Sequence, residues 1–211
     1  MKVLVACEYS GTVRDAFAAL GHDATSCDLL PTETPGKHYE GSVLDIINDG
    51  WDLMIGHPPC TYISYAATGY WDQPGRARKR LEALDFFLQL WEAPIDRICL
   101  ENPVGCADAI ITKHSQIVHP YYFGDSDMKR TCLWLRNLPK LVSIRGGDLF
   151  SEATVIEKPQ PIYTDKLGKK RYRTDAISGG SEAARKERAR FFPGIAKAMA
   201  EQWGGLIKKV A

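Results

Sequence analysis

Short apolar runs alternate with helix-patterned segments along the first half of the chain. Residues 2–7 (KVLVAC) form a β-branched run that predicts a buried strand. Residues 12–21 carry apolar side chains at helical spacing and end at a glycine, which predicts a helix. Residues 22–30 then predict a second strand, which ends near Asp28. This order of strand, turn, helix and strand is that of a βαβ unit.

The same alternation continues downstream. Residues 51–56 predict another buried strand, residues 81–91 a helix, and residues 97–100 a further strand. Strands that alternate with helices favour a doubly wound, mostly parallel α/β sheet. Residues 131–135 predict one more strand, and residues 181–209 a mostly helical segment.

Composition adds two exclusions. The 211 residues are 45% hydrophobic and 25% charged, which is typical of a globular protein and excludes bulk disorder. The formal net charge of +1 excludes a strongly basic coat for nucleic acid, although it allows a local basic patch.

The cysteines and the start of the chain indicate a cellular setting. None of the six cysteines forms a CxxC pair, so a zinc ribbon is not expected. His114, His119 and Cys106 match no metal-ligand spacing, and we expect no metal site. The N-terminus does not resemble a signal peptide, and no apolar window is long enough to span a membrane. We therefore expect a cytoplasmic protein with free thiols and no membrane partner.

Polar clusters follow four of the predicted strands, at Glu8–Gly11, Asp28, Gly56–Cys60 and Glu101–Pro103. In open α/β sheets, ligands bind beyond the carboxyl ends of the strands. We therefore expect these clusters to face one pocket.

Three of these residues have two interpretations each. Cys60 is either a nucleophile held by two prolines or an unreactive cysteine in a proline turn. Glu101 is either a general acid or partner for a heterocycle, or a turn carboxylate. Asp28 is placed to accept hydrogen bonds from ribose hydroxyls, although the first turn holds only Gly11 in place of a GxGxxG motif.

Basic residues gather in two segments. Residues 62–80 interleave aromatic and cationic side chains that either stack on bases and pair with phosphates or belong to a solvated helix start. Residues 166–173 hold a second cluster, in which a solvated hairpin is the alternative to a binding role. The first segment contains Tyr62, Tyr65, Tyr70, Trp71, Arg76, Arg78, Lys79 and Arg80.

The order of these motifs resembles the cytosine-C5 DNA methyltransferases, and in particular their compact, phage-type members. The family's Pro-Cys motif matches Gly56–Cys60, and its Glu-Asn motif matches Leu100–Pro103. A later arginine-bearing block matches Lys129–Leu135, in which Arg130 is the best match. Residues 187–198 resemble the family's arginine-bearing helix and the helix that follows it.

This resemblance implies a class I methyltransferase-like, Rossmann-type fold and a catalytic mechanism. Cys60 would add to C6 of a cytosine, Glu101 would bind the ring N3 and exocyclic amine, and Arg130 would hold the O2 side. S-adenosylmethionine would be the methyl donor, and a target base in duplex DNA would be flipped out of the stack.

The resemblance also implies two sets of binding residues. Asp28 and Asp45 would face the cofactor's ribose and adenine, while Glu8 and Gly11 would line its methionine side. The full cofactor set is Glu8, Gly11, Asp28, Asp45 and Pro58. The DNA set is Pro59, Asn102, Tyr62, Tyr65, Arg76 and Arg78.

The chain departs from the family in its first turn, Cys7–Gly11, in Thr61 after Pro-Cys, and in its size. We expect a catalytic core at 1–139, a short basic insert at 140–180 in place of a target-recognition domain, and a C-terminal helical segment at 181–211. The short insert leaves open an enzyme that acts on free pyrimidine nucleotides or transfers another group. The altered first turn leaves open a non-catalytic protein that binds DNA or masks its sites.

Overall fold

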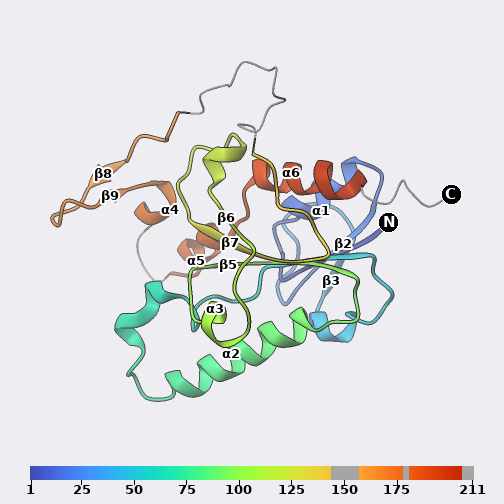
Figure 1. The fold of residues 1–211 in the computed structure, drawn as a ribbon, viewed down its shortest axis with the longest axis horizontal. Coiled ribbons are helices and arrows are strands. Elements are labelled where there is room, and N and C mark those ends of the chain that lie inside the picture. The colour runs from blue at the N-terminus through green and yellow to red at the C-terminus, as the bar shows by residue number, and fades with distance from the viewer. Residues whose placement is uncertain (144–156, 178–180, 206–211) are drawn as a thin grey trace.

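A seven-stranded, mostly parallel sheet organises the computed structural model, which describes residues 1–143, 157–177 and 181–205 (Figure 1). The strand order is β3-β2-β1-β4-β5-β7-β6. In this sheet β7 runs opposite to the other six strands, so its pairings with β5 and β6 are antiparallel and the remaining pairings are parallel. This order confirms the predicted doubly wound α/β sheet. The strands are β1 (Lys2–Ala6), β2 (Asp23–Asp28), β3 (His38–Glu40), β4 (Leu53–Gly56), β5 (Arg97–Pro103), β6 (Gln116–Val118) and β7 (Thr131–Arg136).

Helices cover both faces of the sheet (Figure 1). On one face α1 (Thr12–Ala19) packs against α6 (Pro193–Gly204), and both share a buried cluster with Val3 and Val5 of β1. On the other face α2 (Arg76–Trp91) packs in a second cluster with Leu4. Because successive side chains of a strand point to opposite faces, the run of apolar residues in β1 serves both clusters.

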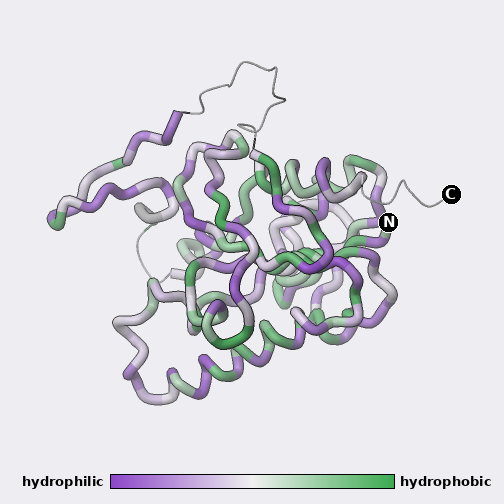
Figure 2. Tube along the Cα trace, in the orientation of Figure 1, coloured by the Kyte–Doolittle hydropathy of each residue, from purple (hydrophilic) through white to green (hydrophobic). Residues whose placement is uncertain are grey.

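Shorter elements connect and extend these layers. They are the helical turns η1 (Val43–Asp45), η2 (Tyr65–Tyr70) and η3 (Pro120–Phe123), the short helices α3 (Ala107–Ile110), α4 (Arg173–Ala176) and α5 (Glu182–Ala189), and the strands β8 (Tyr163–Thr164) and β9 (Lys170–Arg171). Figure 2 shows hydrophobic residues concentrated in the sheet and its covering helices, and a largely hydrophilic β8–β9 hairpin. Within the described ranges, no helix has the length and apolar character needed to cross a membrane.

Two element boundaries differ from the predictions. The helix expected from residue 81 begins earlier, at Arg76, because Gly75 adopts a left-handed conformation (φ 79°) that starts α2 directly after a turn. The segment over 181–209 was expected to be mostly helical with an interruption at Gly194. It is divided into α5 and α6, but the break falls just before Gly194, because Pro193 lacks an amide hydrogen and begins a new helix. The end of that segment and residues 144–156 of the insert lie outside the described residues.

Candidate active site

A pocket of about 660 Å³ lies at the carboxyl edge of the sheet, where β1 and β4 are neighbours. After β1 the chain continues through α1 to β2 on one side, and after β4 it continues through α2 to β5 on the other. Such a switch point is where open α/β sheets bind ligands, because loops diverge there and leave a crevice. The lining residues are Cys7, Glu8, Tyr9, Ser10, Asp28, Leu30, His57, Pro58, Pro59, Cys60, Thr61, Glu101, Asn102, Pro103, Lys129, Lys186, Arg188, Ala189 and Phe191. All four predicted clusters therefore contribute to one pocket.

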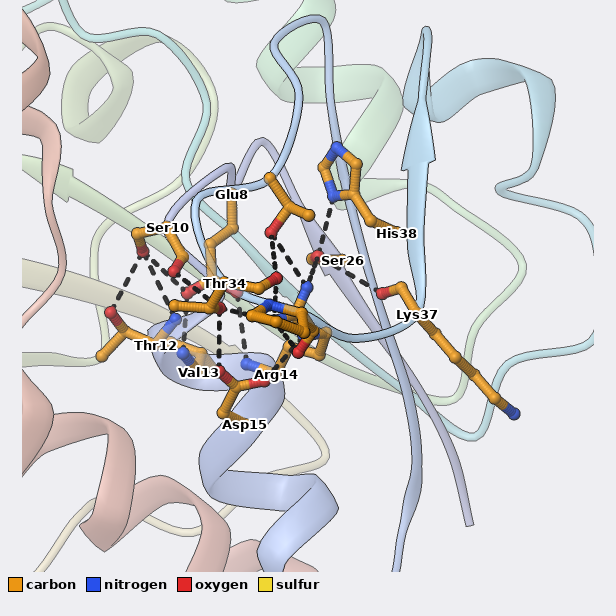
Figure 3. Close-up of polar contacts among 12 residues, drawn as sticks. Glu8, Ser10, Thr12, Val13, Arg14, Asp15, Ser26, Thr34, Lys37 and His38 are labelled. Carbon is orange, nitrogen blue, oxygen red and sulfur yellow. Dashed lines mark hydrogen bonds and ion pairs between the residues drawn. The ribbon is translucent and has the colours of Figure 1, made fainter.

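Glu8 forms part of the first wall, and its carboxylate also caps α1. The amide N–H groups of Val13 and Arg14 donate to its two oxygens, at 2.6 and 3.2 Å (Figure 3). Burial raises the pKa of Glu8, although His57 and these two amides act in the opposite direction. Helix amides that lack an intrahelical partner are thereby satisfied, so Glu8 anchors the turn between β1 and α1.

Gly11 does not line the pocket, contrary to the expectation that it faces a ligand. Its φ of 76° suits glycine, and a Cβ built on it would lie 2.2 Å from Oγ1 of Thr34. The glycine is therefore required by the close approach of the loop after β2. The lone glycine of the first turn is therefore explained by packing between two loops.

Arg14 of α1 anchors the loop that follows β2. Its side chain is only 1% exposed, and its guanidinium donates to Oγ1 of Thr32 (3.0 Å) and of Thr34 (2.7 Å). It also donates to Oγ of Ser26 at 3.2 Å and to the carbonyl oxygen of Pro35 at 3.3 Å (Figure 3). These bonds hold the loop that begins with Asp28 and places Leu30 at the pocket.

The two aspartates expected near a cofactor have different positions. Asp28 lies at the end of β2 and lines the pocket, and its Oδ1 accepts from the amide of Leu30 at 3.0 Å. Burial raises the pKa of Asp28 above its ordinary value. Asp45 is outside the pocket lining, in η1, where its carboxylate accepts from the hydroxyl of Tyr39 at 3.2 Å.

Cys60 is exposed and is held by a tight turn after β4. Its carbonyl oxygen accepts from the amides of Ile63 and Ser64, at 3.2 and 2.9 Å. Neighbouring protein atoms reduce the solvation of this exposed thiol and, with the Glu101 carboxylate, raise the pKa of Cys60, while Lys129 and Arg188 partly oppose this. The resting sulfur is therefore a thiol, and positive charge close by favours its conversion to a thiolate.

Glu101 is a buried carboxylate that lines the same pocket as Cys60, with 7% of its surface exposed. Nδ1 of His57 lies 3.4 Å from its Oε2. Burial raises the pKa of Glu101, but Lys129 and His57 outweigh burial and hold the pKa below its ordinary value. A buried carboxylate that stays charged under these conditions is suited to accept hydrogen bonds from a ligand.

Three buried polar atoms at this end of β4 and β5 have no partner among the described residues. They are Oε1 of Glu101, Nε2 of His57 and Oδ1 of Asn102. By contrast, Nδ2 of Asn102 donates to the carbonyl oxygen of Pro58 at 2.7 Å and joins the ends of the two strands. Because buried polar groups are normally hydrogen-bonded, the unpaired atoms indicate that a polar ligand completes the pocket.

The segment from α5 to α6 supplies the opposite wall. Lys186, Arg188 and Phe191 line the pocket, and the Phe191 ring packs on His57 with centroids 4.5 Å apart. Lys129 lines it as well, whereas Arg130, the arginine expected at the base, does not. None of these lining residues has a role predicted from the sequence. Lys129, Arg188 and Phe191 lie within the segments that carry the resemblance, and Lys186 directly precedes one of them.

The aromatic and basic segment at 62–80 lies beside the pocket. Tyr62, Tyr65, Arg76 and Arg78 are absent from its lining. The Arg76 guanidinium covers the Tyr62 ring at 4.7 Å from its centroid, and Tyr65 packs on Trp71 at 5.9 Å. These rings thus already contact neighbouring side chains, although Tyr65 and Tyr70 remain exposed, so this face presents both cations and aromatic rings.

Comparison with known proteins adds a limited similarity. No protein-family model and no curated protein matches the chain. A solved structure from a prophage of Escherichia coli, described as a DNA modification methyltransferase, is similar at 16% identity and a TM-score of 0.41. The match covers 64% of this chain and 46% of that chain, so this chain spans less than half of that protein. Among the described residues, no group of three His, Cys, Asp or Glu side chains could hold a metal ion.

Proposed function

We propose that the protein is a DNA methyltransferase that modifies cytosine at C5. The observation that carries the proposal is the placement of exposed Cys60 and buried Glu101 in one pocket, with Oε1 of Glu101 unpartnered. A nucleophile and a buried carboxylate that face a shared space are the two groups this reaction requires of the protein.

Cys60 starts the reaction by adding to C6 of the cytosine ring once its thiol proton has passed to the Glu101 carboxylate. Its sulfur donates an electron pair to C6, and the electrons of the C5–C6 double bond move to C5, which becomes nucleophilic. Glu101, now protonated, donates to the ring N3 and accepts from the exocyclic amine, and so stabilises the negative charge that develops in the ring. After C5 has been modified, loss of its proton restores the double bond and expels the Cys60 thiolate.

The residues at the opposite end of the pocket fit S-adenosylmethionine, which supplies an electrophilic methyl group when bound. Asp28 follows β2 and lines the pocket, as expected of a carboxylate that binds ribose hydroxyls. The turn at Glu8–Ser10 forms the adjoining wall. The pocket volume of about 660 Å³ is within the range of ligand sites.

DNA is the proposed substrate because cations surround the pocket. Lys129, Lys186 and Arg188 line it, and Arg76 and Arg78 lie on the neighbouring segment. Such groups neutralise phosphates, while a flipped cytosine would occupy the pocket itself. In this arrangement Arg130 contacts the substrate outside the pocket lining.

The decisive experiment measures transfer of tritium from labelled S-adenosylmethionine to duplex DNA. We expect Cys60→Ala to abolish transfer, because Cys7, the other cysteine among the described lining residues, has a thiol whose pKa burial raises well above its ordinary value. Cys106→Ala, which alters a buried cysteine outside the pocket lining, should retain it. Equal incorporation by the unaltered protein and Cys60→Ala would show that Cys60 is not the nucleophile.

A free pyrimidine nucleotide is the second candidate substrate. The pocket cations Lys129, Lys186 and Arg188 could bind the phosphate of a single nucleotide as well as that of a chain. Assays that compare deoxycytidine monophosphate with duplex DNA distinguish the two. Modification of the nucleotide alone would favour the second candidate, and DNA binding without either product would indicate a non-catalytic protein.

A further inference from the structure

The β8–β9 hairpin extends away from the body of the protein (Figure 1). Tyr163 pairs with Arg171 and Thr164 with Lys170, in antiparallel register. The amide of Ile162 donates to the carbonyl oxygen of Arg171 at 2.8 Å and lengthens the ladder. The hairpin is therefore a two-stranded ribbon that the sheet does not cover.

Positive charge is concentrated in this ribbon. Residues 158–173 contain six Lys or Arg and one Asp, a formal charge of +5, whereas the whole chain carries +1. Lys166, Lys169 and Lys170 are exposed, and the described residues provide no ion pair for them. A projection of this charge favours a polyanionic partner over a second copy of the nearly neutral chain.

Hydrogen bonds hold the tip of the ribbon in a tight turn, and one large apolar side chain projects from it. The Asp165 carboxylate accepts from the amides of Leu167 and Lys169, at 3.0 and 2.9 Å, and from Nε of Arg171 at 2.9 Å. Gly168, with φ 76°, completes the turn. Leu167 is 93% exposed at this fixed tip. The side chain is thus presented to a partner without a further cost of ordering the loop.

The base of the ribbon is anchored beside the active-site pocket. The buried Asp127 accepts from the amide of Thr174 at 3.1 Å, and Arg173 lies 3.8 Å from the same carboxylate. Asp127 is two residues from Lys129, which lines the pocket. In addition, Arg188 of the pocket donates to the carbonyl oxygen of Ile177 at 2.9 Å. A molecule that enters the pocket therefore passes close to the base of the ribbon.

We propose that residues 158–173 form an arm that grips duplex DNA next to the target base. This inference rests on the proposed function, because it assumes that the pocket receives a base from DNA. Lys166, Lys169 and Lys170 contact phosphates, and Leu167 enters a groove and wedges between base pairs. A two-stranded ribbon fits a DNA groove, and leucine is among the side chains that proteins insert between base steps.

The charge of the arm is tested by binding of a fluorescently labelled duplex oligonucleotide over a range of salt concentrations. A triple variant, Lys166→Gln with Lys169→Gln and Lys170→Gln, removes three phosphate contacts. We expect the slope of log K against log salt to become shallower by about 2–3, since each contact contributes about 0.9. The matched control replaces three exposed lysines elsewhere, with Lys113→Gln, Lys140→Gln and Lys197→Gln, and should leave most of the slope unchanged.

The wedge is tested with Leu167→Ser and a duplex that contains 2-aminopurine beside the target cytosine. We expect the unaltered protein to increase the probe's fluorescence by unstacking it, and Leu167→Ser to lose most of the increase while it retains the salt slope. Transfer to single-stranded DNA should be the same for both, because no stack has to be opened.

Four outcomes distinguish a failure of the proposed arm from a failure of the proposed function. Equal slopes for the triple variant and its control, or equal fluorescence for Leu167→Ser and the unaltered protein, overturn the arm. Failure of the unaltered protein to bind duplex DNA overturns both proposals. Arm-dependent binding without methyl transfer supports the arm and contradicts the proposed chemistry. Methyl transfer that none of these variants affects supports the chemistry and contradicts the arm.

Discussion

Replacement of Arg14 by methionine should destabilise the protein strongly, although Arg14 lies outside the pocket lining. The substitution keeps an unbranched chain of similar length and removes only the guanidinium. Ser26, Thr32 and Thr34 would lose the hydrogen bonds that the guanidinium donates to them. The Arg14 side chain, which is 1% exposed, joins these residues to α1. These acceptors lie between β2 and the following loop, where water reaches them poorly.

The expected magnitude follows from these contacts. A hydrogen bond from a charged group contributes about 1.5–3 kcal/mol, but bonds that share one guanidinium do not add. Each buried acceptor left without a donor costs about 1–3 kcal/mol, and because Arg14 bonds to several of them we expect a loss of about 3–5 kcal/mol for Arg14→Met. For a chain of this size the loss corresponds to a decrease in Tm of roughly 6–20 °C.

Urea denaturation followed by circular dichroism measures the free energy of unfolding directly. Arg78→Met is the matched control, because the Arg78 side chain is 87% exposed and pairs only with Glu82, so its loss should cost less than about 0.5 kcal/mol. Hydrogen exchange should also accelerate at the amide of Glu33, which donates to the carbonyl oxygen of Tyr9 across the anchored loop. A loss no greater than that of the control would refute the view that Arg14 holds this loop.

Two further predictions concern reactivity and packing. Because the pKa of Cys60 is raised, we expect its alkylation by iodoacetamide to reach half its maximal rate at a higher pH than alkylation of an ordinary thiol does, and Lys129→Gln to move that midpoint higher still. Peptide mass spectrometry measures both midpoints. A downward shift in the variant would contradict the role of the lysine. We expect Gly194→Ala to destabilise the fold by about 1–3 kcal/mol, since a Cβ there would lie 2.2 Å from the carbonyl oxygen of Phe123. Gly205→Ala, with open space around it, should be neutral. Thermal denaturation compares the two variants, and equal Tm values would show that the contact relaxes freely.

The sheet could be predicted from the sequence because its signals are local. Apolar runs such as residues 2–7 and 51–56 determine which segments become strands, and parallel strands bring their carboxyl ends to one edge. The convergence of Glu8, Cys60 and Glu101 could therefore be predicted from the sequence. The start of α2 was missed because it depends on the left-handed conformation of Gly75, which side-chain periodicity does not record.

The second wall of the pocket could not be predicted in the same way. Lys186, Arg188 and Phe191 reach the pocket through packing that involves α5 and α6, and no pattern in the sequence reports which strand end they meet. Lys129 and Arg130 are neighbours, and only the backbone direction before β7 decides that Lys129 lines the pocket. Motif order thus indicated Cys60 as the candidate nucleophile, whereas the cations around it required the three-dimensional structure.

The packing of Phe191 on His57 also orders the maturation of the pocket during translation. Proteins begin to fold from the N-terminal side while the ribosome still synthesises the rest. The nascent chain acquires β1, β4, β5 and the Cys60 turn well before residues 186–191 emerge. A chain that ends before residue 186 therefore holds Cys60 and Lys129 but lacks Arg188, one of the two cations that lower the pKa of this thiol. The wall that Lys186, Arg188 and Phe191 form is thus the last part of the pocket to be synthesised.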